Sequence, residues 1–246
     1  QQLAEDGVLH TACGDIFQVD KDTTPQPLHL YAHQLQALAK AAQGQSYVVT
    51  TGTGSGKSLS FFIPIIDRIV KAKVQDGAAR TRAIVIYPMN ALANSQLEEL
   101  QKFLPGLTPP VTFARYTGQE REEVHEQIRA NPPDILLTNF MMLELILTRF
   151  EDVDRRVVEH CQGLEFLVLD ELHTYRGRQG ADVALLVRRL RERLQAHQLV
   201  CIGTSATMSS TGTQADRNQT VATVATLLFG AQITEHDVIG ETLERV

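Results

Sequence analysis

A glycine-rich loop between a β-branched run and an apolar segment has the clearest chemistry in this sequence. Residues 46–58 read SYVVTTGTGSGKS. Glycines allow a turn whose backbone N–H groups face an anion, Lys57 can reach the β- and γ-phosphates of a nucleotide, and Ser58 can hold Mg²⁺. A helix beginning here would add the positive end of its dipole. The predicted phosphate-binding residues are Thr53, Gly54, Ser55, Gly56, Lys57 and Ser58. Thr51 departs from the general loop pattern, which has Gly or Ala there.

Two adjacent acids after a second apolar run supply the partner that this loop requires. Residues 164–169 read LEFLVL, and Asp170 and Glu171 follow. An acid at the end of such a strand can hold Mg²⁺, and its neighbour can orient and deprotonate the attacking water. Alone, the two acids are typical of a solvated strand end. Together with the loop they predict ATP hydrolysis, with Asp170 on the metal and Glu171 as general base.

The elements that must position these groups alternate along the chain. Continuous apolar runs that do not alternate are typical of strands covered on both faces, as in a parallel sheet between helices. We therefore expect one α/β unit with a central, mostly parallel sheet of about six strands, flanked by helices on both faces. The expected strands are 47–50, 83–87, 111–116, 135–138, 165–169 and 199–203. The expected helices are 28–43, 58–73, 90–103, 119–130, 181–197 and 220–229.

Composition limits the class of protein and its partners. A chain of 246 residues allows one full domain and at most two. No run approaches the ~18 apolar residues of a membrane span, so we expect no membrane partner. Cys13, Cys161 and Cys201 lack metal-finger spacing and indicate buried thiols in a reducing cytoplasm. Because the net charge is −6, any nucleic-acid binding must use local groups.

The motifs resemble those of a known family in both type and order. TGSGKS at 53–58 and DELH at 170–173 resemble motifs I and II of superfamily 2 helicases of the DExH-box branch. Further stretches resemble the adenine-reading glutamine segment, motif Ia, the short glycine motif, motif Ib and motif III; these are residues 31–34, 88–96, 116–118, 137–139 and 205–208. The run HTYRG at 173–177 is most similar to DNA-repair helicases of the mitomycin-repair type.

This resemblance implies a RecA-like P-loop domain that uses ATP and Mg²⁺, with the motif III strand between those of motifs I and II. It implies that Gln34 and Tyr31 contact adenine and that Ser58 and Asp170 hold the metal. Backbone contacts to nucleic acid, DNA favoured over RNA, would come from Pro88, Asn90, Gln96, Thr117, Gly118, Thr138 and Asn139. Coupling between the two sites would involve His173, Ser205 and Thr207.

Each of these residues also has a simpler explanation. Gln34 could be a surface residue of its helix, Thr138 and Asn139 a turn after a strand, and Ser205 a cap of the next segment. The ordered set favours the functional interpretation.

The domain organisation follows from the same resemblance. Residues 1–27 are expected to be an irregular lead-in, 28–235 the ATP-binding domain, and 236–246 the approach to an interdomain linker. A second RecA-like domain would belong to the same longer chain, which we expect in the bacterial cytoplasm with the nucleoid. Two alternatives stay open: a non-unwinding translocase subunit of a phage-defence or restriction system, and an ATP-dependent nucleic-acid binding module.

Overall fold

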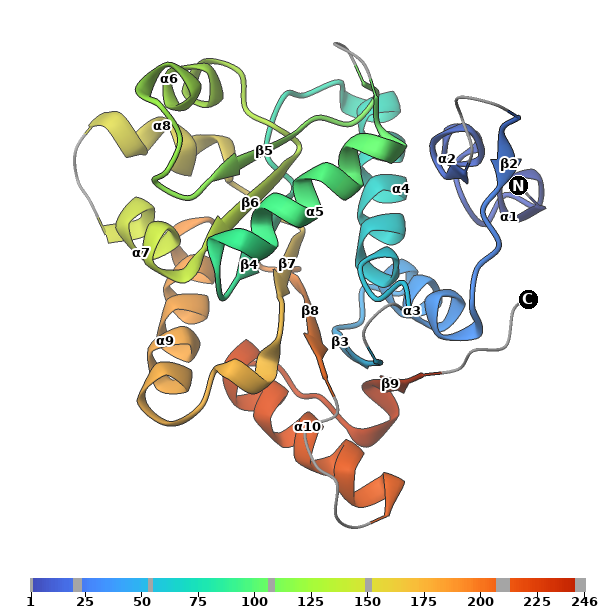
Figure 1. The fold of residues 1–246 in the computed structure, drawn as a ribbon. Coiled ribbons are helices and arrows are strands. Elements are labelled where there is room, and N and C mark those ends of the chain that lie inside the picture. Colours follow the sequence, from blue (N-terminus) through green and yellow to red (C-terminus); the bar gives the residue numbers. More distant parts are fainter. Residues whose placement is uncertain are drawn as a thin grey trace.

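A parallel sheet forms the centre of the structure, a computed structural model that describes residues 2–19, 24–52, 55–105, 109–148, 152–206 and 213–241. Its strands are β3 (Tyr47–Thr50), β4 (Ala83–Tyr87), β5 (Phe113–Tyr116), β6 (Ile135–Asn139), β7 (Phe166–Leu169), β8 (Val200–Ser205) and β9 (Val238–Gly240). They lie in the order β5-β6-β4-β7-β8-β3-β9, and every neighbouring pair is parallel (Figure 1). The predicted parallel α/β sheet is confirmed.

Helices cover both faces of this sheet. One face packs against α3 (Ala32–Ala42), α4 (Leu59–Asp76) and α5 (Asn90–Phe103). The other packs against α6 (Glu122–Ala130), α7 (Phe140–Thr148), α8 (Asp152–His160), α9 (Gly177–Arg193) and α10 (Gln214–Phe229). Successive strand residues point to opposite faces, so Val49 and Val85 belong to the first core and Val48 and Ile84 to the second. This two-sided burial explains the continuous apolar runs of the strands.

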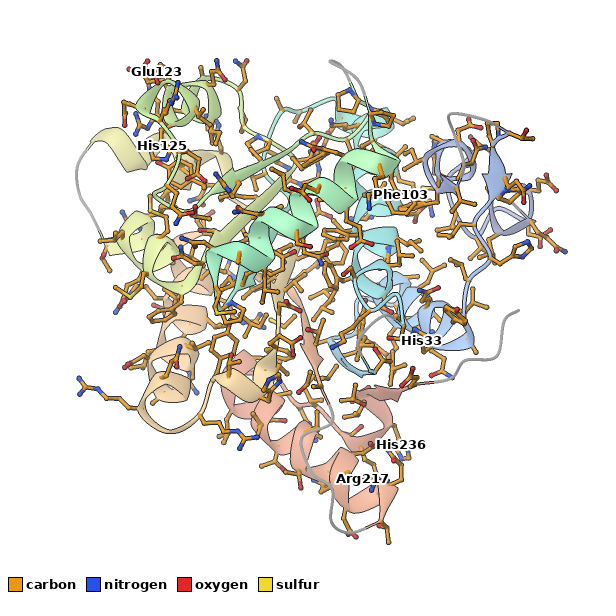
Figure 2. All side chains as sticks on the ribbon, viewed as in Figure 1. His33, Phe103, Glu123, His125, Arg217 and His236 are labelled. Atoms are coloured by element: carbon orange, nitrogen blue, oxygen red, sulfur yellow. The ribbon has the colours of Figure 1, made fainter. Side chains whose placement is uncertain are left out.

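The N-terminal residues are more ordered than the expected irregular lead-in. They contain the short helices α1 (Gln2–Glu5) and α2 (Thr11–Ile16) and the antiparallel strands β1 (Gln18–Val19) and β2 (Gln26–Pro27). These elements lie outside α4 (Figure 1). The Phe17 ring lies 5.5 Å from the ring of Phe103. Phe103, labelled in Figure 2, ends α5. Burial of Cys13, Ile16 and Phe17 in the same core as α4 accounts for this order.

Three further elements were not expected from the sequence. The apolar run of α7 directly follows β6, and Glu144 and Thr148 are too few polar positions to mark its helical period. The helix α8 is short and mostly polar, and its apolar stripe consists of few residues, of which Val157 and Val158 pack in the core. The strand β9 has only three residues and gains its partner from β3, with Val48 opposite Val238. A short 3₁₀ turn (Glu235–Asp237) precedes it. Within the described ranges, no helix has the length and apolar character needed to cross a membrane.

Gly203 in β8 is a position where the fold leaves no room for a side chain. A Cβ atom there would lie 2.4 Å from Leu172 Cδ1 and 3.1 Å from Phe229 Cζ, both in fully buried residues. We expect Gly203→Ala to destabilise the protein by about 1–3 kcal/mol through overpacking. Gly240→Ala in β9, where a Cβ would meet nothing within 4 Å, is the matched control and should change stability by less than about 0.5 kcal/mol. Urea unfolding measures both, and equal midpoints would contradict this packing.

Candidate nucleotide site and nucleic-acid interface

The predicted functional segments meet at one edge of the sheet. Because all seven strands are parallel, their carboxyl ends lie on the same side. The strand β3 leads into the phosphate loop and β7 leads into Asp170 and Glu171. The strand β8, which ends at Ser205, lies between them, as expected for the motif III strand. The sheet order therefore brings residues more than a hundred positions apart into one site.

Side-chain hydroxyls brace the described part of the phosphate loop. Ser55 Oγ lies 2.7 Å from Thr51 Oγ1 and 2.9 Å from the carbonyl oxygen of Gly52. Thr51, the residue that departs from the general loop pattern, is fully buried and supplies this contact. Thr53 and Gly54 lie outside the described residues. The unusual threonine thus has a structural use within the loop.

Gln34 holds the other end of the loop. Its Nε2 donates to the carbonyl oxygen of Gly56 at 3.0 Å, and its Oε1 accepts from the backbone N–H of Tyr31 at 3.0 Å. Gly56 has a φ of +69°, and a Cβ there would lie 2.7 Å from Gln34 Nε2, so this position requires glycine. Gln34 is buried rather than a surface residue of α3. Its contact with adenine, and that of Tyr31, remain predictions.

The loop lysine and the acidic pair face each other. Lys57 Nζ lies 3.6 Å from Glu171 Oε1, and both side chains are largely buried. Ser58 is the N-cap residue of α4, so the positive end of that helix lies at the same place. Lys57 and Asp170 are 113 positions apart in the sequence, but their segments are close in space. The structure brings them together as the sequence predicted.

Asp170 is a partly exposed carboxyl group that Thr204 contacts directly. Burial raises its pKa, and the charge of Glu171 raises it further, whereas a hydrogen bond from Thr204 and the charge of Lys57 oppose the rise. Thr204 Oγ1 donates a short hydrogen bond to Asp170 Oδ1. The sequence prediction missed Thr204. A signal was available, since residue 204 is on the same face of β8 as Ile202, in the core shared with Val168.

Glu171 connects the lysine to the segments predicted to couple the two sites. Its Oε2 is 3.1 Å from His173 Nδ1, and His173 Nδ1 is 3.5 Å from Ser205 Oγ. The backbone of Glu171 is left-handed, with φ 54° and ψ 58°, which is strained for a residue other than glycine. Strain of this kind gathers at functional sites. Thr207 lies outside the described residues.

Two asparagines join three of the segments expected to contact nucleic acid. Asn139 Nδ2 donates to Asn90 Oδ1 at 2.8 Å and to the carbonyl oxygen of Thr117 at 3.2 Å. Asn139 Oδ1 accepts from the backbone N–H of Met142 and so begins α7. Asn90, Asn139 and Pro88 are each partly exposed at this edge. Gln96 is also partly exposed, although its Oε1 is buried without a hydrogen-bond partner among the described residues.

Two of the expected backbone contacts need correction. Thr138 is fully buried and its hydroxyl donates to the carbonyl oxygen of Tyr116 at 2.6 Å, so it joins β6 to β5 and does not reach the surface. The Thr117 hydroxyl bonds to Glu120 at 2.9 Å, and the Gly118 N–H donates to the same carboxylate at 3.0 Å. In this turn Gly118 and Gln119 are exposed, whereas Thr117 is buried.

No local signal predicted a role for Glu120. Burial would raise its pKa, but the hydrogen bonds from Thr117 and Arg115 outweigh this and bring the pKa to about 2. The Glu120 carboxylate thus accepts from the backbone N–H groups of Thr117 and Gly118, two residues that the resemblance assigned to contacts with the nucleic-acid backbone.

Known proteins resemble this chain in both sequence and fold. Residues 31–215 match the DEAD/DEAH box helicase family. The ATP-dependent helicase YprA of Bacillus subtilis is 31% identical over 74% of this chain and 23% of its own length. The Druantia protein DruE of Escherichia coli is 27% identical over 73% of this chain and 16% of its own length. The chain thus spans less than a quarter of either relative.

Solved structures agree. The helicase MrfA bound to DNA has a TM-score of 0.70 and 26% identity, covering 88% of this chain and 28% of MrfA. Its fold is the RecA-like helicase fold, which DEAD-box Mss116 also shares at 14% identity and a TM-score of 0.72 over 97% of this chain and 44% of its own. The family match covers well over half of the chain. The chain therefore belongs to the DEAD/DEAH box helicase family.

Proposed function

We propose that this chain is the ATP-binding motor domain of an ATP-dependent helicase or translocase that moves along a nucleic-acid strand. The observation that carries the proposal is the 3.6 Å approach of Lys57 to Glu171, the residue next to the partly buried carboxyl group of Asp170. A cation, a metal-binding carboxylate and a general base are the groups that phosphoryl transfer from ATP to water requires.

The residues present suit a hydrated Mg²⁺. Hydroxyl and carboxylate oxygens are the ligands that this ion prefers, and Ser58 and Asp170 supply them. When bound, the ion neutralises charge on the phosphate oxygens. Glu171 Oε2 lies 3.1 Å from His173 Nδ1 and Oε1 lies 3.6 Å from Lys57 Nζ, and this carboxylate would accept a hydrogen bond from the attacking water. In this proposal Lys57 binds the terminal phosphates and Glu171 accepts the proton of the attacking water.

The nucleic-acid strand would lie along the carboxyl ends of β4, β5 and β6. Side-chain amides contact phosphates without reading bases, which suits Asn90 and Asn139 in an acidic protein. DNA is favoured because MrfA was solved bound to DNA and Mycobacterium smegmatis Lhr bound to single-stranded DNA and AMP-PNP. His173 and Ser205 would carry the state of the ATP site to this strand.

A second RecA-like domain of the same protein completes the motor in this proposal. It would supply an arginine finger and the other half of the strand-binding groove.

The buried free thiols of Cys13, Cys161 and Cys201 support a reducing cytoplasm, and a DNA motor there would act at the nucleoid.

The isolated 246-residue chain should bind ATP with Mg²⁺ but hydrolyse it slowly. An arginine finger is worth about 10³–10⁵ in rate in related NTPases, and we assign that group to the second domain. Titration with a fluorescent ATP analogue measures binding, and phosphate release measures turnover. No binding would overturn the proposed function, whereas rapid turnover would overturn only the need for a second domain.

A non-unwinding translocase is the second candidate. DruE matches nearly the same share of this chain as YprA does. The same motor domain therefore suits either a helicase or a non-unwinding translocase. The motor chemistry would be identical in both. Strand displacement by the full-length protein separates them, because a translocase consumes ATP on DNA without releasing the complementary strand.

A further inference from the structure

A single buried hydroxyl group connects the two acids of the candidate site. Thr204 is 0% exposed. Its Oγ1 donates to Asp170 Oδ1 and accepts from the backbone N–H of Glu171 at 3.0 Å. A threonine hydroxyl has one proton and two lone pairs. The proton is used on Asp170, so the bond with Glu171 uses a lone pair, and the two contacts are compatible.

The sheet register explains why residue 204 meets both acids. Leu169 of β7 is opposite Gly203 of β8, so the next positions along the two strands, Asp170 and Thr204, are also adjacent. On its other side β8 pairs with β3, where Thr204 is opposite Val49, just before the phosphate loop. The hydroxyl therefore lies in the strand between the loop and the acids.

The contact with Glu171 restrains a strained backbone. Left-handed conformations of residues other than glycine persist only where surrounding contacts enforce them. The Thr204 bond to the Glu171 N–H and the Thr174 bonds to the Glu171 carbonyl oxygen, at 2.8 and 2.9 Å, fix the peptide groups on both sides of its Cα. They thereby direct the Glu171 side chain, whose Oε1 faces Lys57.

We propose that Thr204 is a positioning residue for the ATPase site: it turns the Asp170 carboxylate so that Oδ2 serves the hydrated metal, and it holds Glu171 in line with the terminal phosphate. This inference rests on the proposed function. It goes beyond the motif resemblance, which assigned roles to Ser205 and Thr207 and none to residue 204.

The test compares Thr204→Val with Thr204→Ser in the 246-residue chain. Valine keeps the shape and removes both hydrogen bonds, whereas serine keeps the hydroxyl. The first readout is binding of a fluorescent ATP analogue as Mg²⁺ is titrated, and the second is the single-turnover rate of ATP cleavage. Removing a group that orients a metal ligand typically lowers metal affinity or activity by about 10–100-fold. We expect Thr204→Val to weaken the apparent Mg²⁺ affinity by about 10-fold or more, with binding in EDTA unchanged and Thr204→Ser close to wild type.

Ile202→Val is the matched control for packing. Ile202 is buried on the same face of the same strand, so its truncation loosens the core without touching the acids and should leave the Mg²⁺ titration unchanged. If Thr204→Val does not fold, Thr204→Cys replaces it, since a thiol is a weaker donor and should give an intermediate loss.

The outcomes separate this inference from the proposed function. Wild-type protein that binds ATP without any effect of Mg²⁺ would overturn both. If wild-type binding depends clearly on Mg²⁺, and Thr204→Val, or Thr204→Cys in its place, fully retains that dependence, only the role of Thr204 is overturned. A loss equal to that of Ile202→Val would likewise reduce Thr204 to a packing residue.

Discussion

Glu171→Gln is expected to reduce ATP cleavage by about 10²–10⁴-fold, the range for removal of a general base. Glutamine has nearly the same shape as glutamate but cannot accept the proton of the attacking water. Nucleotide binding should persist or tighten, because the change also removes the carboxylate 3.6 Å from Lys57 and leaves the ammonium to the phosphates. Loss of rate with retained affinity is the signature of a group needed only in the transition state.

Single-turnover cleavage with excess protein measures this effect even when turnover is slow. Glu165→Gln is the matched control, since Glu165 lies at the opposite end of β7, where it pairs with Arg68 and Arg80. The control should cleave ATP at the wild-type rate. An unchanged rate in Glu171→Gln would instead revive the alternative of a binding module that uses ATP as a structural ligand.

Lys57→Ala is expected to abolish detectable ATP binding at micromolar concentrations. Truncating one partner of a desolvated charge contact typically costs about 2–5 kcal/mol, which is at least roughly 30-fold in Kd. The same change leaves Glu171 close to the phosphates without a cation, so repulsion adds to the loss. The defect should appear in affinity, in contrast to the rate defect of Glu171→Gln.

Calorimetric titration with ATP and Mg²⁺ measures the affinity of both variants. Lys71→Ala, on the same helix, is the control because Lys71 bonds to Asp67 and the carbonyl oxygen of Val8, away from the phosphate loop. Wild-type affinity in Lys57→Ala would mean that the nucleotide binds elsewhere.

The sequence predicted the elements whose signals are local. Strands β3 and β4 and helix α5 have the predicted bounds, because a continuous apolar run or a clear helical period defines each of them. Strand β9 was missed because its stability comes from pairing with β3 across the chain. Helix α10 begins at Gln214, earlier than predicted, because the polar first turn is fixed by the capping box of Thr213 and Asp216 and has no apolar period.

The residues of the site also fall into two groups, those that the local sequence predicts and those that depend on the pairing of distant segments. The loop glycines, Lys57 and the acidic pair were predictable because motif spacing encodes them. Thr204 has only the signal of a hydroxyl on the core-facing side of β8, and its partners depend on strand register. Glu120 depends on a turn folding back upon itself and has no local signal. Thr138 was predicted to contact the nucleic-acid backbone. Its hydroxyl instead donates to the carbonyl oxygen of Tyr116 on the neighbouring β-strand, a contact that only the sheet order reveals.

A crystal structure of the chain with Mg²⁺ and a non-hydrolysable ATP analogue would locate the nucleotide. We expect one triphosphate contacted by Lys57, with its metal held by Ser58 and, through water, by Asp170. A nucleotide bound away from the carboxyl ends of β3 and β7, or a triphosphate whose metal shows no link to Asp170, would contradict this expectation.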